Sequence, residues 1–227
     1  MIVCQICGWS GEYESTTCPR CKKKIQLSRE DIAARTEKIK KALSSNDFET
    51  AIENYVMLAD FGDAASQREL GILLESGDLI NRDLDRAMKY FLLAAEQNDA
   101  VAAYRYARLA SRTSDVAARF WLVYSAVLGC EEAYAEVAER FAAEGDHVHA
   151  SYYYALAAES GDTDAIVTMA KRYHGGIGTE VSDQYARWYL DKLPIPPFHA
   201  IKLAYKLRAT EAVEPPRVEF SDFDEFI

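Results

Sequence analysis

Residues 87–98 read AMKYFLLAAEQN, and three other stretches of the chain repeat their pattern. Each stretch starts with an alanine, has a second alanine eight residues later, and has a glycine or asparagine three residues after that. The starts of successive stretches lie 31 to 36 residues apart, a period typical of stacked helical hairpins. The other three stretches are 51–62 (AIENYVMLADFG), 118–129 (ARFWLVYSAVLG) and 150–161 (ASYYYALAAESG).

The residue types at these positions predict how the helices pack. Alanines eight residues apart lie on one face of a helix, where their small side chains let a neighbouring helix approach closely. Aromatic residues between them, such as Phe91 and Trp121, fill the space between helices, and the final glycine closes the helix in the left-handed conformation. A second alanine-rich helix should follow each turn, and a partial fifth unit starts at Ala186 and departs from the pattern at Pro194. The expected second helices are 64–75, 100–110, 131–143 and 164–173.

Two segments resemble the Sel1-like repeat: residues 70–95, LGILLESGDLINRDLDRAMKYFLLAA, and residues 173–189, YHGGIGTEVSDQYARWY. In this family a glycine-rich linker with an aspartate, here Asp83 or Asp183, joins one hairpin to the next. The resemblance implies an all-α fold, a right-handed solenoid of Sel1-like helical hairpins over 47–208, and an adaptor that binds other proteins. Shorter linkers at 111–115 and 144–146 make the third and fourth units similar to tetratricopeptide repeats.

Four cysteines near the N-terminus are spaced as metal ligands, in the pattern Cys4-x2-Cys7-x10-Cys18-x2-Cys21. Two pairs of soft thiolates suit the tetrahedral coordination of a structural Zn2+. The spacing therefore predicts a small zinc ribbon at residues 1–27 with one structural Zn2+. A redox function is less favoured because neither pair follows a strand that leads into a helix, and four unrelated cysteines are the remaining alternative.

The charge distribution separates the N-terminus from the rest of the chain. The whole chain carries −10, but residues 1–45 hold nine Lys/Arg against five Asp/Glu. The acidic remainder would repel a phosphate backbone, so nucleic-acid contact is expected only through Lys22, Lys23 and Lys24. A regulatory protein whose ribbon contacts nucleic acid through these lysines is the alternative function. A cysteine cluster kept reduced for metal, with no apolar run long enough for a membrane span, indicates a cytoplasmic protein.

No set of residues in the sequence indicates catalysis. His147 and His149 diverge on a helix, His174 is expected in a turn, and His199 is expected to open the last helix. Cys130 follows a glycine and has no identifiable histidine base. The glycines after His174 lack the lysine and serine or threonine of a phosphate-binding loop. The chain is therefore predicted not to be an enzyme.

Two groups of residues are candidates for contacts with a protein partner. Tyr and Arg are common anchors of protein interfaces, which selects Tyr104, Arg105 and Arg108, although packing between repeats is the simpler explanation for most aromatic residues. The second group lies in an acidic tail at 209–227, which is expected to be flexible and could dock into an apolar groove of a partner or of the solenoid itself. Between the ribbon and the solenoid, residues 28–46 should form a connecting helix that caps the first repeat. The tail candidates are Phe220, Phe223 and Phe226.

Overall fold

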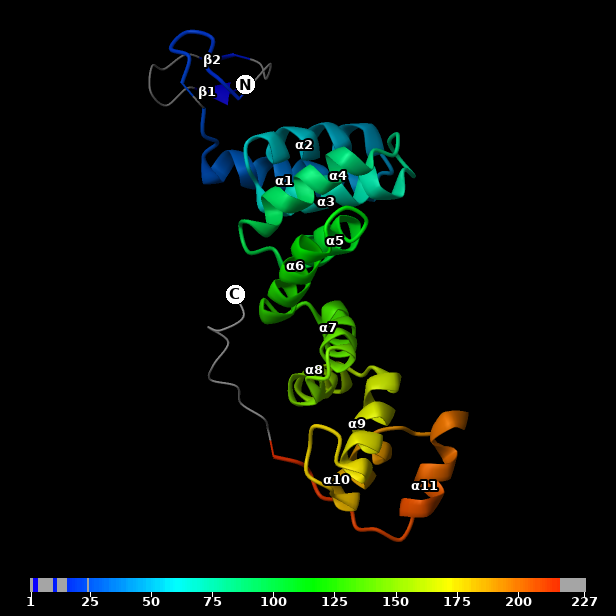
Figure 1. The fold of residues 1–227 in the computed structure, drawn as a ribbon. Coiled ribbons are helices and arrows are strands. Elements are labelled where there is room, and N and C mark those ends of the chain that lie inside the picture. The colour runs from blue at the N-terminus through cyan, green and yellow to red at the C-terminus, as the bar shows by residue number, and fades with distance from the viewer. Residues whose placement is uncertain (1, 4–9, 12–15, 24, 217–227) are drawn as a thin grey trace. The chain divides into compact units, whose positions relative to one another are not determined.

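A computed structural model describes residues 2–3, 10–11, 16–23 and 25–216 of the chain (Figure 1). These residues are mostly α-helical, as the repeat pattern predicts. Near the N-terminus, strand β1 (Ile2–Val3) pairs antiparallel with β2 (Ser10–Gly11). The chain divides into two compact units, which we call the N-terminal unit (Met1–Trp121) and the C-terminal unit (Leu122–Ile227).

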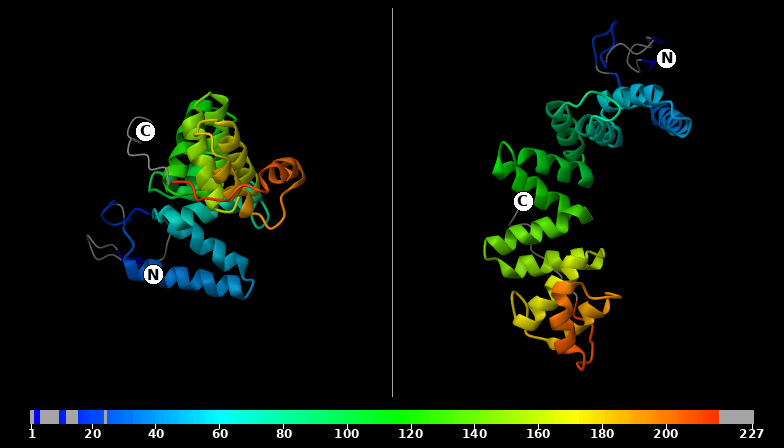
Figure 2. Two further views of the ribbon diagram at one scale, coloured as in Figure 1. Left: turned by 90° about the horizontal axis from the view of Figure 1, so that it is seen from below. Right: turned by 90° about the vertical axis from the view of Figure 1, so that its right-hand side faces the viewer.

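The helices follow one another in pairs joined by short turns, and each predicted second helix is confirmed (Figures 1 and 2). The N-terminal unit holds α1 (Arg29–Ser44), α2 (Phe48–Asp60), α3 (Ala64–Ser76), α4 (Leu84–Ala95) and α5 (Ala100–Ala110). Helix α6 (Asp115–Val127) spans the division between the units. The C-terminal unit continues with α7 (Glu131–Ala143), α8 (His147–Glu159), α9 (Thr163–Gly175), α10 (Asp183–Asp191), the 3-10 turn η1 (Phe198–Ala200) and α11 (Ile201–Leu207).

A two-residue sequence ends one helix and starts the next in most of these turns. A glycine or asparagine adopts a left-handed conformation, as at Gly161 with φ of 93°. The aspartate that follows accepts a hydrogen bond from the backbone N–H three residues on, as Asp162 does from Ala165 at 2.8 Å. Glycine or asparagine tolerates the positive φ, and the aspartate caps an unpaired helix N-terminus. The pairs are Asn46–Asp47, Gly62–Asp63, Asn98–Asp99, Gly145–Asp146 and Gly161–Asp162.

The core of the N-terminal unit lies between consecutive helices. Leu70 of α3 and Phe91 of α4 are almost completely buried in one apolar cluster. Helix α1 begins with a capping box formed by Ser28 and Asp31, and it covers α2 through a second cluster that contains Ile39. Helix α1 therefore packs directly on α2.

The C-terminal unit buries a continuous core from α8 to α11. Met169 of α9, Tyr189 of α10 and Leu207 of α11 belong to one cluster. After α11 the chain returns to α10, where the Val213 N–H donates to the Gln184 carbonyl at 3.4 Å. The described part of the predicted tail, up to residue 216, therefore lies against the repeats.

Two details of the linkers differ from the prediction. His174 lies in the last turn of α9 and not in a turn between helices, and its Nδ1 is 2.5 Å from a carboxylate oxygen of Asp183. Asp83 of the first such linker caps α4, whereas in the next linker of this type Ser182 is the cap of α10. Because Ser182 caps α10, the Asp183 carboxylate is available to bind His174.

Candidate functional site

A buried arginine fixes the linker between α9 and α10 against the start of α8. Arg172 is 6% exposed, and its Nη1 donates to the carbonyls of His147 (3.2 Å) and Ile177 (3.1 Å) and to the Ser151 hydroxyl (3.0 Å). Its guanidinium also lies 4.9 Å from the centre of the Tyr154 ring. Burial lowers the pKa of Arg172, but its bonds to carbonyl oxygens satisfy the charged group. Arg172 therefore holds the linker, residues 176–182, in place as a rigid wall beside α8.

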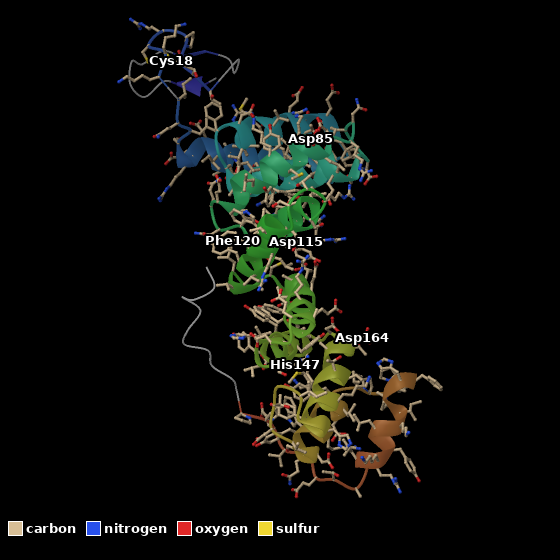
Figure 3. The ribbon with its side chains drawn as sticks, in the orientation of Figure 1. Cys18, Asp85, Asp115, Phe120, His147 and Asp164 are labelled. Carbon is tan, nitrogen blue, oxygen red and sulfur yellow. The ribbon has the colours of Figure 1, made fainter. Side chains whose placement is uncertain are left out.

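Gly178 lets this wall approach the start of α8 (His147, labelled in Figure 3). Its φ is 65°, and a Cβ on Gly178 would overlap the His147 carbonyl oxygen, a backbone atom that cannot rotate away. Only glycine fits such a close approach of two backbone segments. The linker continues with Thr179, whose hydroxyl donates to the Arg172 carbonyl at 3.1 Å.

Four aromatic side chains line a pocket beside this wall. Tyr152 comes from α8, Tyr173 from α9, and Trp188 and Tyr189 from α10. The Tyr173 and Tyr189 rings stack with centroids 5.8 Å apart, and Trp188 meets Tyr189 edge-on at 5.0 Å. Such packed rings hold each other in place. The floor of the pocket is therefore formed by aromatic rings that hold one another in place.

Three carboxylates surround the aromatic residues. Glu159 lies at the end of α8, Glu180 in the linker and Glu214 in the segment after α11, and all three are exposed. Burial raises the pKa of Tyr173, and the negative charge of Glu180 raises it further. Burial and then the charge of Glu159 act in the same direction on the pKa of Tyr152. The carboxylates thus lie near enough to the rings to give the pocket a negative potential.

The pocket has a volume of about 220 Å³ and is closed on one side by Pro215 and Pro216. We call this pocket of about 220 Å³ the acidic pocket. A larger hollow of about 540 Å³ lies along α2 and α4, but its polar side chains bind one another, as Gln97 does with Gln67 at 2.9 Å. The acidic pocket is defined by Tyr152, Tyr173, Trp188, Glu159, Glu180 and Glu214.

The predicted partner residues on α5 are engaged within the N-terminal unit. Arg105 forms an ion pair with Glu75 of α3 at 2.8 Å, and the Arg108 guanidinium lies 5.8 Å from the centre of the Tyr104 ring. The structure brings these residues together but does not test whether they bind a partner, so this surface stays a prediction. Phe220, Phe223 and Phe226 lie outside the described residues.

The structure describes two of the four predicted zinc ligands, Cys18 and Cys21. Cys18 is buried, and its Sγ accepts a hydrogen bond from the Cys21 N–H at 3.5 Å (Cys18 is labelled in Figure 3). Lys22 follows in a left-handed conformation with φ of 60°, which completes a tight turn around the sulfur. An N–H aimed at sulfur stabilises a thiolate, so this turn suits a metal ligand pair. Cys4 and Cys7 lie outside the described residues, and within the described ranges no three potential ligands gather.

The two cysteines also belong to a small apolar cluster with α2. Cys18 and Ile25 are buried there, and Met57 of α2 and Phe61, the residue after this helix, pack against them. The N-terminal segment therefore packs on the first hairpin. Lys22 and Lys23 are exposed, Lys24 lies outside the described residues, and nucleic-acid contact through these lysines stays a prediction.

The remaining cysteine and the histidines are buried or contact neighbouring side chains within the fold. Cys130 is buried at the start of α7, where burial raises the pKa of its thiol to about 12. His149 binds Asp146 at 2.6 Å, and His199 lies in the 3-10 turn before α11, as expected for the opening of the last helix. His174 links three helices, because its Nε2 faces the Lys206 ammonium of α11 at 2.9 Å.

The Sel1 repeat profile matches three segments of the chain, residues 64–99, 139–162 and 164–193. Each of these three segments is similar to a Sel1 repeat. The first matched segment contains α3, its linker and α4, and the third contains α9, its linker and α10. The second matched segment includes the short turn at 144–146, so the profile matches there despite the shortened linker.

Solved structures of Sel1 repeat proteins share the fold. A Sel1 repeat protein from Oxalobacter formigenes is 24% identical with a TM-score of 0.63, and the alignment covers 70% of this chain and 49% of that one. The c5321 protein, a protective antigen of uropathogenic Escherichia coli strains displaying an SLR fold, is 20% identical with a TM-score of 0.61. That alignment covers 71% of this chain and 38% of the antigen. The chain thus spans half or less of the length of these two proteins, and a search of curated sequences gives no match.

Sequence reasoning missed the acidic pocket. The segment 173–189 that resembles a Sel1-like repeat does contain Gly178 and Trp188. Tyr152 lines the pocket, whereas its neighbour Tyr153 is buried. The three glutamates come from separate segments, and no spacing in the sequence joins them.

Proposed function

We propose that the chain is a non-catalytic adaptor that binds protein partners through its Sel1 repeats. The observation that supports this function best is the acidic pocket, which opens on the surface of two consecutive Sel1 repeats with a rigid aromatic floor and a polar rim. Aromatic residues at the centre of a pocket with polar groups around it are typical of protein interfaces. The pocket contains no nucleophile with an adjacent base, and the buried thiol of Cys130 is protonated at neutral pH.

We also propose one structural Zn2+ held by Cys4, Cys7, Cys18 and Cys21. The turn at Cys18 and Cys21 supports it, because two thiols with a backbone N–H directed at one sulfur match the donor set of a structural zinc site. When bound, zinc would contribute folding free energy to a segment too small for its own core. Reduced zinc ligands agree with a cytoplasmic location, which is part of this proposal. Within the described residues, none of the helices is long and apolar enough to cross a bilayer.

Affinity capture from the native lysate tests the adaptor function. The bait is the full chain, with two shortened versions that lack residues 1–27 or residues 215–227. We expect the full chain to retain a specific protein at stoichiometric levels and at least one deletion to lose it. A full chain that retains nothing above an unrelated helical-repeat control would contradict the proposal.

A further inference from the structure

We propose that the acidic pocket binds the cationic side chain of an arginine or lysine in a basic segment of a protein partner. This inference rests on the proposed adaptor function and names the chemistry of its partner. Four properties of the C-terminal unit support it: the charge at the pocket, its aromatic floor, its rigid wall and the charge of the chain that follows it.

Three carboxylates line the pocket, which gives it more negative than positive charge. Glu159, Glu180 and Glu214 come from three separate segments, and none of them forms an ion pair with a described residue. The described lining includes no Lys, Arg or His. The guanidinium of Arg172 donates to the hydroxyl of the lining residue Ser151 and to a linker carbonyl, so one positive charge lies beside the three carboxylates. A hollow lined by one sign of charge attracts the opposite sign.

The aromatic floor suits a cation as well. Tyrosine and tryptophan rings attract ammonium and guanidinium groups through their π-electrons, most strongly where water is excluded. The same unit already uses this contact at its surface, because the Lys192 ammonium lies 4.1 Å from the centre of the Trp188 ring. Lys192 does not line the pocket. The Lys192 ammonium also lies 5.6 Å from the centre of the Tyr189 ring. Tyr152 and Tyr173, from α8 and α9, are the other rings that a cation inside the pocket would meet.

The wall of the pocket is fixed before any ligand arrives. Arg172 and Gly178 hold the linker against α8, and the Ser182 N–H donates to the Tyr173 carbonyl at 2.9 Å. Met169 and Tyr173 at the base are 2% and 5% exposed. A site that does not need to be ordered loses less entropy on binding, so a single side chain can be recognised there.

The charge of the C-terminal segment favours a partner over the chain's own tail as the occupant. Arg217 follows the pocket residue Pro216 directly, but residues 219–227 add two glutamates and two aspartates and no further basic residue. These carboxylates would be repelled by the glutamates of the pocket. A foreign segment with an arginine or lysine among neutral or basic neighbours carries no such repulsion.

The test uses the full chain and two short peptides that differ in one charge. The probe is acetyl-Gly-Gly-Arg-Gly-Gly-amide, and its control carries citrulline, which has the shape of arginine without the charge. Binding is followed by NMR of the Trp188 indole N–H, which is assigned with Trp188→Phe. We expect saturable shifts of this signal with the arginine peptide, a Kd at least tenfold lower than for citrulline, and weaker binding in high salt.

Substitution of the carboxylates then locates the site. The triple variant Glu159→Gln, Glu180→Gln, Glu214→Gln changes only exposed residues, so the fold should be kept. We expect it to weaken arginine-peptide binding at least tenfold. Glu211→Gln is the matched control, because this glutamate lies in the same segment and outside the pocket lining, and it should leave the Kd unchanged.

Three results would overturn the proposal. They are equal binding of the arginine and citrulline peptides, an unchanged Kd in the triple variant, and binding that appears only after residues 217–227 are deleted. The last result would assign the pocket to Arg217 of the chain itself. A failure of the adaptor function is distinguished by lysate capture: a partner that is retained equally by the full chain and the triple variant leaves the adaptor function standing and removes this inference.

Discussion

At the scale of single residues, one turn motif recurs at five of the connections between helices. A left-handed glycine or asparagine is followed there by a capping aspartate, as at Gly161 and Asp162. Gly129 is left-handed in the same way with φ of 89°, but Cys130 stands where the aspartate would be. Its side chain makes no capping hydrogen bond to α7, although it does donate to Glu132 at 3.3 Å. The first N–H groups of α7 therefore lack the side-chain cap found in the other repeats.

We expect Cys130→Ser to stabilise the protein, because a hydroxyl of nearly the same size can accept the missing capping bond. The gain in the free energy of unfolding should be about 0.5–1 kcal/mol. Urea denaturation followed by circular dichroism measures it. Asp162→Ala is the control, because it removes an existing cap and should lose about 1 kcal/mol. A lower midpoint for Cys130→Ser would contradict this account of the turn.

Burial of Cys130 should make the thiol unreactive and the stability dependent on alkaline pH. The folded protein holds its pKa at about 12, above the ordinary value of 9.0. The stabilisation is therefore complete below about pH 9 and is lost as the pH rises toward 12. We expect iodoacetamide at pH 9 to alkylate Cys130 far more slowly in the native protein than in urea, as measured by peptide mass spectrometry. Equal rates would show an exposed thiolate.

At the scale of helices, glycine determines how closely α3 and α4 can pack. A Cβ on Gly71 of α3 would come within 2.6 Å of the Phe91 ring, and Phe91 is fully buried between its neighbours. The ring cannot move away without disturbing a packed core. At the other end of the chain, His174 joins α9 to α10 through Asp183 and to α11 through Lys206, which holds the short last helix in place.

Gly71→Ala should therefore destabilise the N-terminal unit by about 1–3 kcal/mol through overpacking against Phe91. Gly175→Ala provides a matched control, because this glycine also lies in a helix and the nearest atoms to an added Cβ are 3.6 Å away. The control should be neutral or stabilising by up to about 1 kcal/mol, since alanine favours helix more than glycine does. Thermal unfolding of both variants compares them. Equal melting temperatures for the two variants would show that Phe91 does not limit the approach of the helices.

At the scale of the whole molecule, each unit is built by stacking hairpins on their neighbours in sequence. This is how Sel1 repeats bury their apolar faces, because one hairpin alone cannot do so. The N-terminal segment joins the stack through Cys18 and Ile25, which pack on α2. A metal site in this segment would therefore also support the first repeat.

We expect the native protein to contain one zinc ion per chain. Cys18→Ser should lose the metal, because it removes one of four thiolates, and it should also lower the melting temperature through loss of folding free energy. Elemental analysis of freshly purified, reduced protein measures the stoichiometry. Cys130→Ser, which removes a cysteine outside the cluster, should keep the zinc. A metal content near zero in the reduced native protein would contradict the zinc site.

The sequence alone determined the helical repeats, and the four predicted second helices agree with α3, α5, α7 and α9 to within two residues at each end. The reason is local: alanine spacing sets which helix faces can meet, and glycine, asparagine and aspartate set where a helix ends and the next begins. These signals lie within about 12 residues of one another, so they can be read without the fold. His174 was expected in a turn, but α9 extends through Gly175 and therefore includes it.

Only the tertiary structure showed the acidic pocket. Glu159, Glu180 and Glu214 belong to a helix end, a linker and a segment beyond the last helix, and the packing of α8, α9 and α10 brings them around the same rings. The sequence does not distinguish these glutamates from other exposed glutamates, because the electrostatic potential at each one depends on which groups the fold places beside it. The alanines and turns thus specify that the chain forms stacked repeats, whereas the arrangement of those repeats in space specifies what their surface can bind.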